Sequence, residues 1–227
     1  MSKIYMRTEN NPIFEASPRT AARVLYLSTF IGNESGVLRK TQRTCMQLKH
    51  LSSVLSIGST TAYEFTAEAK DLGLITETEY GLVLPNFSYR KRECGKRPLV
   101  VNQDGLSSLY RNIPARHVQY IGYVLNVFHY INDFYGIVCH NPQEDSIDDI
   151  EPFTFVEFSD MSGLQNASAK RVAQVLSTLT FQFDGKEQRF CSVGPGRKRA
   201  GMRIFVNPNI MYTGKHPENV EALGAFF

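Results

Sequence analysis

Cations and hydrogen-bond donors recur along one side of residues 168–178. Val172, Leu176 and Leu179 follow helical spacing and are expected to face a core. The outward positions are then occupied by donor side chains, which are Lys170, Arg171, Gln174, Ser177 and Thr178. Such side chains bond to phosphates and to base edges. The pattern predicts a helix that reads double-stranded DNA; the alternative is a surface helix packed on a small domain.

Three consecutive cations, Arg197, Lys198 and Arg199, follow this helix. They lie in a loop containing Gly and Pro between two short β-type runs, residues 190–193 and 202–206. The loop is therefore expected to be the tip of a hairpin. A polyanion relieves the repulsion among three like charges, so we expect the tip, with Arg203 on the returning strand, to lie against DNA. A solubilising surface loop is the alternative.

A helix-turn-helix over residues 159–179 is predicted to position these donors. Gly163 is expected to end a first short helix, because glycine accepts backbone angles that break helices. Ser168 is expected to cap the second helix with its hydroxyl. A helix-turn-helix followed by a two-stranded hairpin is the winged-helix arrangement.

The first half of the chain contains a second candidate for this unit. A helix over residues 48–55 is followed by a turn at Gly58 and a helix over residues 59–72, with Ser59 as its cap. A hairpin begins at residues 74–75 and returns through residues 80–84. Candidate DNA contacts on this helix are Ser59, Thr60, Thr61, Tyr63 and Lys70.

Acidic side chains set this first helix apart from the second. Glu64, Glu68 and Asp71 also point outward and would repel phosphate. This copy therefore either docks on DNA by its N-terminal end alone or serves as a dimerisation or partner-binding module.

Two further features repeat. Residues 85–89 and 208–212 both read Pro-Asn-apolar-x-Tyr, just past the respective hairpins. Each predicted unit also follows an apolar helix that starts at a basic residue, over residues 19–31 and 116–131. The repeated order indicates a duplicated module. We predict an α+β protein of two tandem winged-helix domains, residues 1–112 and 113–227.

Charge is unevenly distributed along the chain. Residues 162–215 contain nine Lys and Arg against two acids, whereas residues 141–152 contain no cation. The acidic stretch is predicted to be a solvated loop inserted in the second domain, before a strand at residues 153–158. A basic cluster, Arg90, Lys91 and Arg92 with Lys96 and Arg97, is expected to contact phosphate or to form part of the linker to the second domain.

Composition argues against several classes of protein. No apolar run is long enough to span a bilayer, and residues 1–10 lack a secretory segment. The four cysteines are too scattered for a zinc site and are expected to be free thiols in a reducing cytoplasm. Neither a phosphate-binding Gly-rich loop nor the paired histidines of a nicking enzyme occurs. We therefore predict no catalytic residue, metal or cofactor.

The tandem order, with the residues at 159–179 and 204–214, resembles the replication initiators of bacterial plasmids and phages. In several initiator families the final wing strand runs into an Asn-Pro motif like Asn207–Pro208. The resemblance implies binding to repeats at a replication origin, recruitment of host helicase and primase, and often repression of the initiator's own gene. It implies that Lys170, Arg171 and Gln174 read DNA and that the cations at 197–199 are wing contacts.

Two other functions use the same parts. A transcriptional regulator could carry tandem winged helices, and a scaffold could use them to bind proteins. The chain shows no separate ligand-sensing domain, which disfavours a metabolite-responsive regulator. A homodimer is compatible with each of these functions.

Overall fold

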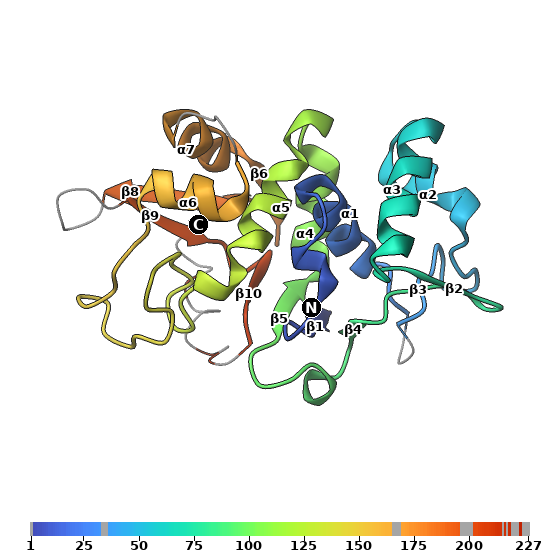
Figure 1. Cartoon of the computed structure of the whole chain (residues 1–227), viewed down its shortest axis with the longest axis horizontal. Helices are drawn as coiled ribbons and strands as arrows, with labels where there is room; N and C mark the ends of the chain where they lie inside the picture. Colours follow the sequence, from blue (N-terminus) through green and yellow to red (C-terminus); the bar gives the residue numbers. More distant parts are fainter. Residues whose placement is uncertain are drawn as a thin grey trace.

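The computed structural model describes residues 2–32, 36–164, 169–195, 202–214, 216, 218 and 223. It is a mixed α+β structure in which helices accompany small antiparallel sheets (Figure 1). The class therefore agrees with the prediction from sequence. Ser168, Arg197, Lys198 and Arg199, four of the predicted DNA contacts, lie outside the described residues.

A four-stranded antiparallel sheet joins segments from both ends of the chain. Its order is β10 (Met211–Thr213), β5 (Leu99–Asn102), β1 (Lys3–Met6) and β4 (Phe87–Ser88). β1 and β5 form its centre, and they pair along their whole length. The edge strands β4 and β10 overlap the two Pro-Asn-apolar-x-Tyr segments. The two similar segments thus occupy opposite edges of one sheet.

The helices and hairpins follow a similar order in each half. The first half contains α1 (Pro18–Ser28), α2 (Leu51–Leu55), α3 (Ser59–Asp71), β2 (Thr76–Thr78) and β3 (Gly81–Val83). The second half contains α4 (Gln103–Asn112), α5 (Gln119–Asn126), α6 (Phe155–Ser162), α7 (Ala169–Thr178), β6 (Thr180–Phe183), β7 (Lys186–Arg189), β8 (Cys191–Pro195) and β9 (Met202–Val206). Short 3₁₀ turns are η1 (Pro12–Phe14), η2 (Leu48–His50), η3 (Lys91–Glu93), η4 (Ala115–His117) and η5 (Phe128–Tyr130).

The same backbone hydrogen bonds form after α1 and after α5. The pairs, donor first, are Gly32–Val37 and Arg39–Phe30 after α1, and Asn132–Ile137 and Cys139–Tyr130 after α5. Each residue of the second set carries a number 100 higher than its counterpart, and no counterpart is identical in type. The two halves therefore share a backbone conformation here that their side chains do not reveal.

α1 and α5 pack against each other at the centre of the molecule (Figure 1). A Cβ at position 122 would lie 1.8 Å from the carbonyl oxygen of Pro18, so only glycine fits at this crossing. Leu25 of α1 and Val124 of α5 are fully buried and belong to one hydrophobic cluster that runs through both halves. This shared core fixes the positions of the helices on either side.

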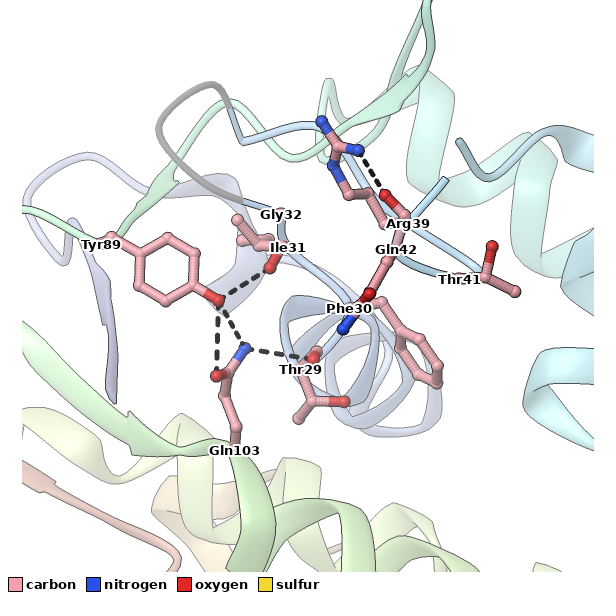
Figure 2. Close-up of a pocket in the computed structure, with 9 residues that line it drawn as sticks. All are labelled: Thr29, Phe30, Ile31, Gly32, Arg39, Thr41, Gln42, Tyr89 and Gln103. Carbon is pink, nitrogen blue, oxygen red and sulfur yellow. Dashed lines mark hydrogen bonds between the residues drawn. The ribbon is translucent and has the colours of Figure 1, made fainter. Parts of the chain in front are cut away.

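Side chains from the sheet cap the C-terminal end of α1. The Tyr89 hydroxyl donates to the carbonyl oxygen of Ile31 over 2.8 Å, and Gln103 Nε2 donates to that of Thr29 over 3.1 Å (Figure 2). Tyr89 directly follows β4, and Gln103 directly follows β5. The carbonyls that a helix end leaves without a partner are thus bonded by neutral side chains.

After α5, a single arginine bonds the carbonyl oxygens at the end of η5. Arg97 donates from Nη1 to the carbonyl oxygen of His129 and from Nη2 to that of Ile131. Its Nε lies 2.6 Å from Oδ1 of Asp133, whose side chain is 0% exposed. The carbonyls at 129 and 131 are the counterparts of those at 29 and 31, but here a charged pair does the capping.

Residues 153–158 form no strand, contrary to the prediction from sequence. They contain the start of α6, where the Thr154 side chain accepts from Glu157 N and Glu157 Oε2 accepts from Thr154 N. This reciprocal arrangement is a capping box. The Thr-x-x-Glu spacing therefore outweighs the β propensity of the aromatic run. The acidic residues before it form a loop, as expected.

The turn between α2 and α3 also differs from the prediction. Ser56 takes the left-handed conformation (φ 55°) that ends α2. Gly58 is extended and is itself the N-cap of α3, so Ser59 is the first helical residue and not the cap. The predicted roles of Gly58 and Ser59 were wrong because the tight turn lies two residues earlier.

Two other boundaries need correction. Residues 116–131 are not one helix, because i→i+3 bonds tighten both ends into η4 and η5 around the shorter α5. Residues 74–75 are buried but precede the hairpin, which starts at Thr76. By contrast, Gly163 (φ 81°) ends α6 and Gly73 (φ 64°) follows α3, as predicted.

The sequence analysis missed the hairpin of β6 and β7. Asp184 and Gly185 connect these strands with φ values of 52° and 73°. Two consecutive positive φ angles are what a two-residue type I′ turn requires, and Asp-Gly is a preferred sequence for it. The Asp-Gly signal was therefore present in the sequence, directly after the β-type run at residues 180–183.

Candidate nucleic-acid interface

α7 presents part of the predicted donor face to solvent. Arg171, Gln174 and Thr178 are exposed, while Leu176 and Leu179 are buried. The hydroxyl of Thr178 donates back to the carbonyl oxygen of Val175 over 2.9 Å, and that of Ser177 to Gln174 over 3.1 Å. Arg171 and Gln174 are therefore the better candidates for base contacts. The side chains of Lys170 and Val172 lie outside the described part of the structure.

Two further cationic or titratable groups lie beside α7, and the sequence analysis did not include them. Arg116 and His117 form η4, immediately before α5. Burial lowers the pKa of His117, and the charges of Arg116 and Arg171 lower it further. Because the charge of Arg171 acts on His117, η4 lies near the start of α7, and we call Arg116, His117 and Arg171 the α7 cluster. The signal in the sequence was the Arg-His pair itself.

The hairpin of β8 and β9 is paired as predicted, from Cys191 opposite Val206 to Pro195 opposite Met202. Arg203 on β9 is half-buried, and its Nη2 lies 3.5 Å from the carbonyl oxygen of Ile147 in the acidic loop. Arg203 therefore faces the acidic loop, which makes it a weaker candidate for DNA contact than the residues of the α7 cluster.

α3 offers donors only near its N-terminal end. Ser59, Thr60 and Tyr63 are exposed, and the Tyr63 side chain is 77% exposed. Lys70 lies at the other end of the helix, where its Nζ pairs with Glu77 Oε2 at 2.9 Å. Of the predicted contacts on α3, those in its first turn and a half therefore form the usable group.

Glu68 is not a free acidic side chain on α3, contrary to the sequence analysis. Its Oε1 accepts from Ser17 N over 2.7 Å, and its Oε2 accepts from the hydroxyls of Ser17 and Thr20. These groups form the first turn of α1, so Glu68 fixes α3 to α1. Glu64 and Asp71 remain exposed.

α3 and α7 flank the central pair of α1 and α5, and both lie on the side away from the four-stranded sheet (Figure 1). The hairpin of β2 and β3 and the hairpin of β8 and β9 extend toward opposite ends of the molecule (Figure 1). The two helices predicted to read DNA thus lie on one side of the fold.

The basic cluster at Arg90, Lys91 and Arg92 lies elsewhere. It belongs to the connection between β4 and β5, which runs away from the helices in Figure 1. Arg90 Nη1 lies 3.6 Å from Glu93 Oε1, and Lys91 and Arg92 are exposed. These residues are not brought together with α3 or α7.

A further basic group surrounds α2. Arg39, Lys40, Arg43 and Lys49 are exposed, and desolvation together with Lys40 and Lys49 lowers the pKa of His50. The sequence shows the signal, because residues 36–63 contain no acid. This group, the α2 cluster (Arg39, Lys40, Arg43, Lys49 and His50), was not predicted.

No protein-family model, curated protein or solved structure matches the chain. The part of the chain that the structure describes contains no helix long and apolar enough to cross a membrane. Within the same residues, no group of three or more His, Cys, Asp or Glu side chains could hold a metal ion. Cys94, Cys139 and Cys191 are buried free thiols, and Cys45 is a half-buried one.

A cavity of about 590 Å³ lies beside the C-terminal end of α1 (Figure 2). Among the described residues that line it, Arg39 is the only charged one, and its Nη1 donates to the carbonyl oxygen of Gln42 over 2.9 Å. Tyr89 and Gln103 are engaged in capping α1. The described lining of this cavity therefore offers fewer free donors than the α7 cluster.

Proposed function

We propose that the chain is a sequence-specific double-stranded DNA-binding protein with two tandem winged-helix domains, and that it acts as a replication initiator of a plasmid or phage. The observation that carries the proposal is the position of α3 and α7 on one side of the fold, with exposed Arg171 and Gln174 on α7. Helices held in this way can enter successive major grooves.

The repeated backbone supports a duplicated module. Hydrogen bonds recur at an offset of 100 residues, and the edge strands β4 and β10 end the two series of elements. In this proposal α2 and α3 form the first helix-turn-helix, and α6 and α7 form the second. The hairpins of β2 with β3 and of β8 with β9 are the wings.

The two copies differ in the DNA contacts they can make. α7 combines Arg171 and Gln174, which suit G and A edges in the major groove, with the cations of η4. α3 has hydroxyls and Tyr63 at its N-terminal end, and Glu64 among them. We therefore propose that α7 supplies most of the base readout and that α3 anchors the protein through the backbone.

The initiator assignment rests on the resemblance around Asn207–Pro208. Asn207 is buried and donates from Nδ2 to the carbonyl oxygen of Arg189 over 2.8 Å, while its Oδ1 accepts from Asn209 N over 2.8 Å. The motif thus links the end of β9 to β7 and to the segment entering β10. Host helicase and primase are the partners that an initiator recruits, and the cytoplasm is the compartment for this work.

Recovery of the DNA fragments that the full chain selects from its own genome tests the proposal. Repeats beside a replication origin support the initiator, a single promoter supports a transcriptional regulator, and no enrichment refutes DNA binding and favours a protein-binding scaffold. On the selected fragment, Arg171→Ala and Gln174→Ala should each weaken binding about 5- to 150-fold, the equivalent of about 1–3 kcal/mol. Lys96→Ala, an exposed cation in the connection between β4 and β5, is the matched control and should change affinity by less than about twofold.

A further inference from the structure

A cavity of about 340 Å³ lies where α1, α3 and α5 meet. Two arginines from α1, Arg19 and Arg23, line it, together with the hydroxyl-bearing side chains of Thr61 and Tyr123. It is separate from the cavity at the C-terminal end of α1 shown in Figure 2, which is lined by other residues.

Arg23 is an unusual member of this lining because it is almost completely buried. The residue is 8% exposed, and its guanidinium lies 5.8 Å from the centroid of the Phe65 ring. Its Nε has no hydrogen-bond partner within the described structure. Desolvation lowers its pKa, and the opposing effects of Tyr110 and Glu68 are smaller. Burial of a guanidinium in this way is unfavourable unless an anion compensates it.

Neither carboxylate that lines the cavity forms an ion pair with Arg23 in the described structure, and Glu68 has only a small effect on it from a distance. Both oxygens of Glu68 accept hydrogen bonds from the first turn of α1, at Ser17 and Thr20. Glu64 is exposed on α3 and forms no ion pair with Arg23 in the described structure. The cavity therefore contains a buried guanidinium that is held by Tyr110 but by no ion pair, and whose Nε has no hydrogen-bond partner among the described residues.

The remaining donors suit a tetrahedral anion. Arg19 is exposed, and its Nη2 donates to Gln119 Oε1 over 3.2 Å, which holds this second guanidinium at the cavity. The Thr61 and Tyr123 side chains add hydroxyl groups. Guanidinium groups bind phosphate strongly because charge and hydrogen bonding act together.

We propose that the cavity between α1, α3 and α5 binds a phosphate group, with Arg23 as the buried partner and Arg19 as the outer one. The phosphate has two sources. It is either a backbone phosphate of the DNA between the segments contacted by α3 and α7, or the phosphate of a free small molecule. The first source rests on the proposed DNA-binding function, whereas the site itself does not.

Thermal unfolding of the full chain in inorganic phosphate, compared with chloride at equal ionic strength, tests the site without DNA. Phosphate at a hundredfold excess over its Kd should raise the Tm of the wild type by roughly 5–10 °C more than that of Arg23→Met. Phosphate also stabilises proteins by exclusion from their surface, so this difference between variants is the informative quantity. Arg189→Met, which replaces an exposed arginine on β7 outside the cavity lining, is the control and should respond like the wild type.

Arg23→Met is expected to fold, because it replaces a buried charge that no ion pair holds by an apolar side chain of similar length. Tyr123→Phe provides a second variant that removes only a hydroxyl group, and it should lose part of the phosphate effect. Glu64→Gln removes a nearby repulsive charge and should strengthen phosphate binding several-fold. Equal stabilisation of the wild type and Arg23→Met by phosphate would overturn the proposal.

DNA binding then distinguishes the two sources. If the phosphate belongs to DNA, Arg23→Met weakens binding to specific and unrelated DNA alike, and inorganic phosphate competes with DNA for the wild type only. If it belongs to a small molecule, phosphate stabilises the wild type while the DNA affinity of Arg23→Met is unchanged. A chain that binds phosphate but no DNA would refute the proposed function and leave the site supported.

Discussion

Replacing Arg97 by Met should be among the more damaging single substitutions outside the apolar core. Arg97 Nε lies 2.6 Å from Asp133 Oδ1, and the side-chain exposures of the two residues are 21% and 0%. Removal of one partner leaves the other charge buried, which costs about 3–5 kcal/mol. The carbonyl oxygens of His129 and Ile131 lose their donor at the same time.

The corresponding fall in Tm is roughly 6–20 °C, at about 2–4 °C per kcal/mol for a chain of this length. Urea unfolding followed by circular dichroism gives the free energy of unfolding directly. The double variant Arg97→Met/Asp133→Asn should recover a large part of the loss, because it removes the buried charge that the single variant leaves behind. Tyr89→Phe is the matched control, because Tyr89 caps the counterpart carbonyl at Ile31 with one neutral hydrogen bond worth about 1 kcal/mol.

Two results would refute this reasoning. One is a loss for Arg97→Met no greater than that for Tyr89→Phe. The other is a double variant as unstable as the single one, which would show that the uncompensated carboxylate is not the source of the cost. Either result would mean that the apolar packing of α1 against α5 joins the two halves without help from the charged pair.

Three other predictions follow from the site and the caps. Specific DNA affinity should rise as the pH falls from 8 toward 5. The pKa of His117 is lowered in the free protein, and a nearby DNA phosphate raises it, so binding takes up a proton. His117→Gln should flatten this pH profile in a fluorescence-anisotropy titration. Thr154→Ala should lower the free energy of unfolding, measured in urea, by about 1 kcal/mol. The bonds from Thr154 lower the pKa of Glu157. The share of the stabilisation that depends on the Glu157 carboxylate is therefore fully present above the ordinary pKa of a glutamate and disappears as the pH falls through the lowered value. A thiol reagent at pH 8 should modify Cys45 quickly and the other three cysteines only as fast as the chain opens. Burial raises the pKa of Cys94 to about 11 and that of Cys139 to about 12, and it also raises the pKa of Cys191. Rapid reaction of more than one thiol would contradict the buried positions.

Local patterns in the sequence predicted local structure well. The helices at α2, α3, α6 and α7, the hairpin of β8 and β9 and the helix-ending glycines at 73 and 163 all depend on residues close in sequence. The errors were also local. The aromatic run at residues 153–158 predicted a strand, although Thr154 and Glu157 form a capping box that starts a helix. The Asp-Gly turn between β6 and β7 was overlooked.

What the sequence did not predict depends on residues far apart in the chain. The central sheet pairs β1 with β5 and β5 with β10, which no local pattern encodes. The bond network of Glu68 with Ser17, the Arg97–Asp133 pair and the cavity around Arg23 each join elements more than 35 residues apart. The helical periodicity of α3 predicts an outward-facing Glu68, but its carboxylate accepts hydrogen bonds from Ser17 and Thr20 at the start of α1.

The two halves form the same backbone hydrogen bonds after α1 and after α5, although the side chains at those positions differ. Main-chain bonds at an offset of 100 residues fix how each central helix passes into the next strand, whatever side chains are present. The side chains near these bonds differ in charge between the two halves. In the first half, Arg39, Lys40 and Arg43 are exposed cations. In the second half, an acidic loop follows Cys139, the counterpart of Arg39. α3 and α7 also carry different exposed side chains. A DNA site contacted by both should be asymmetric, with tight base readout under α7 and mainly backbone contact under α3. Comparable base preferences under both helices would show that exposed donors near an N-terminal end, such as Ser59 and Thr60, can replace the Arg171 and Gln174 pair.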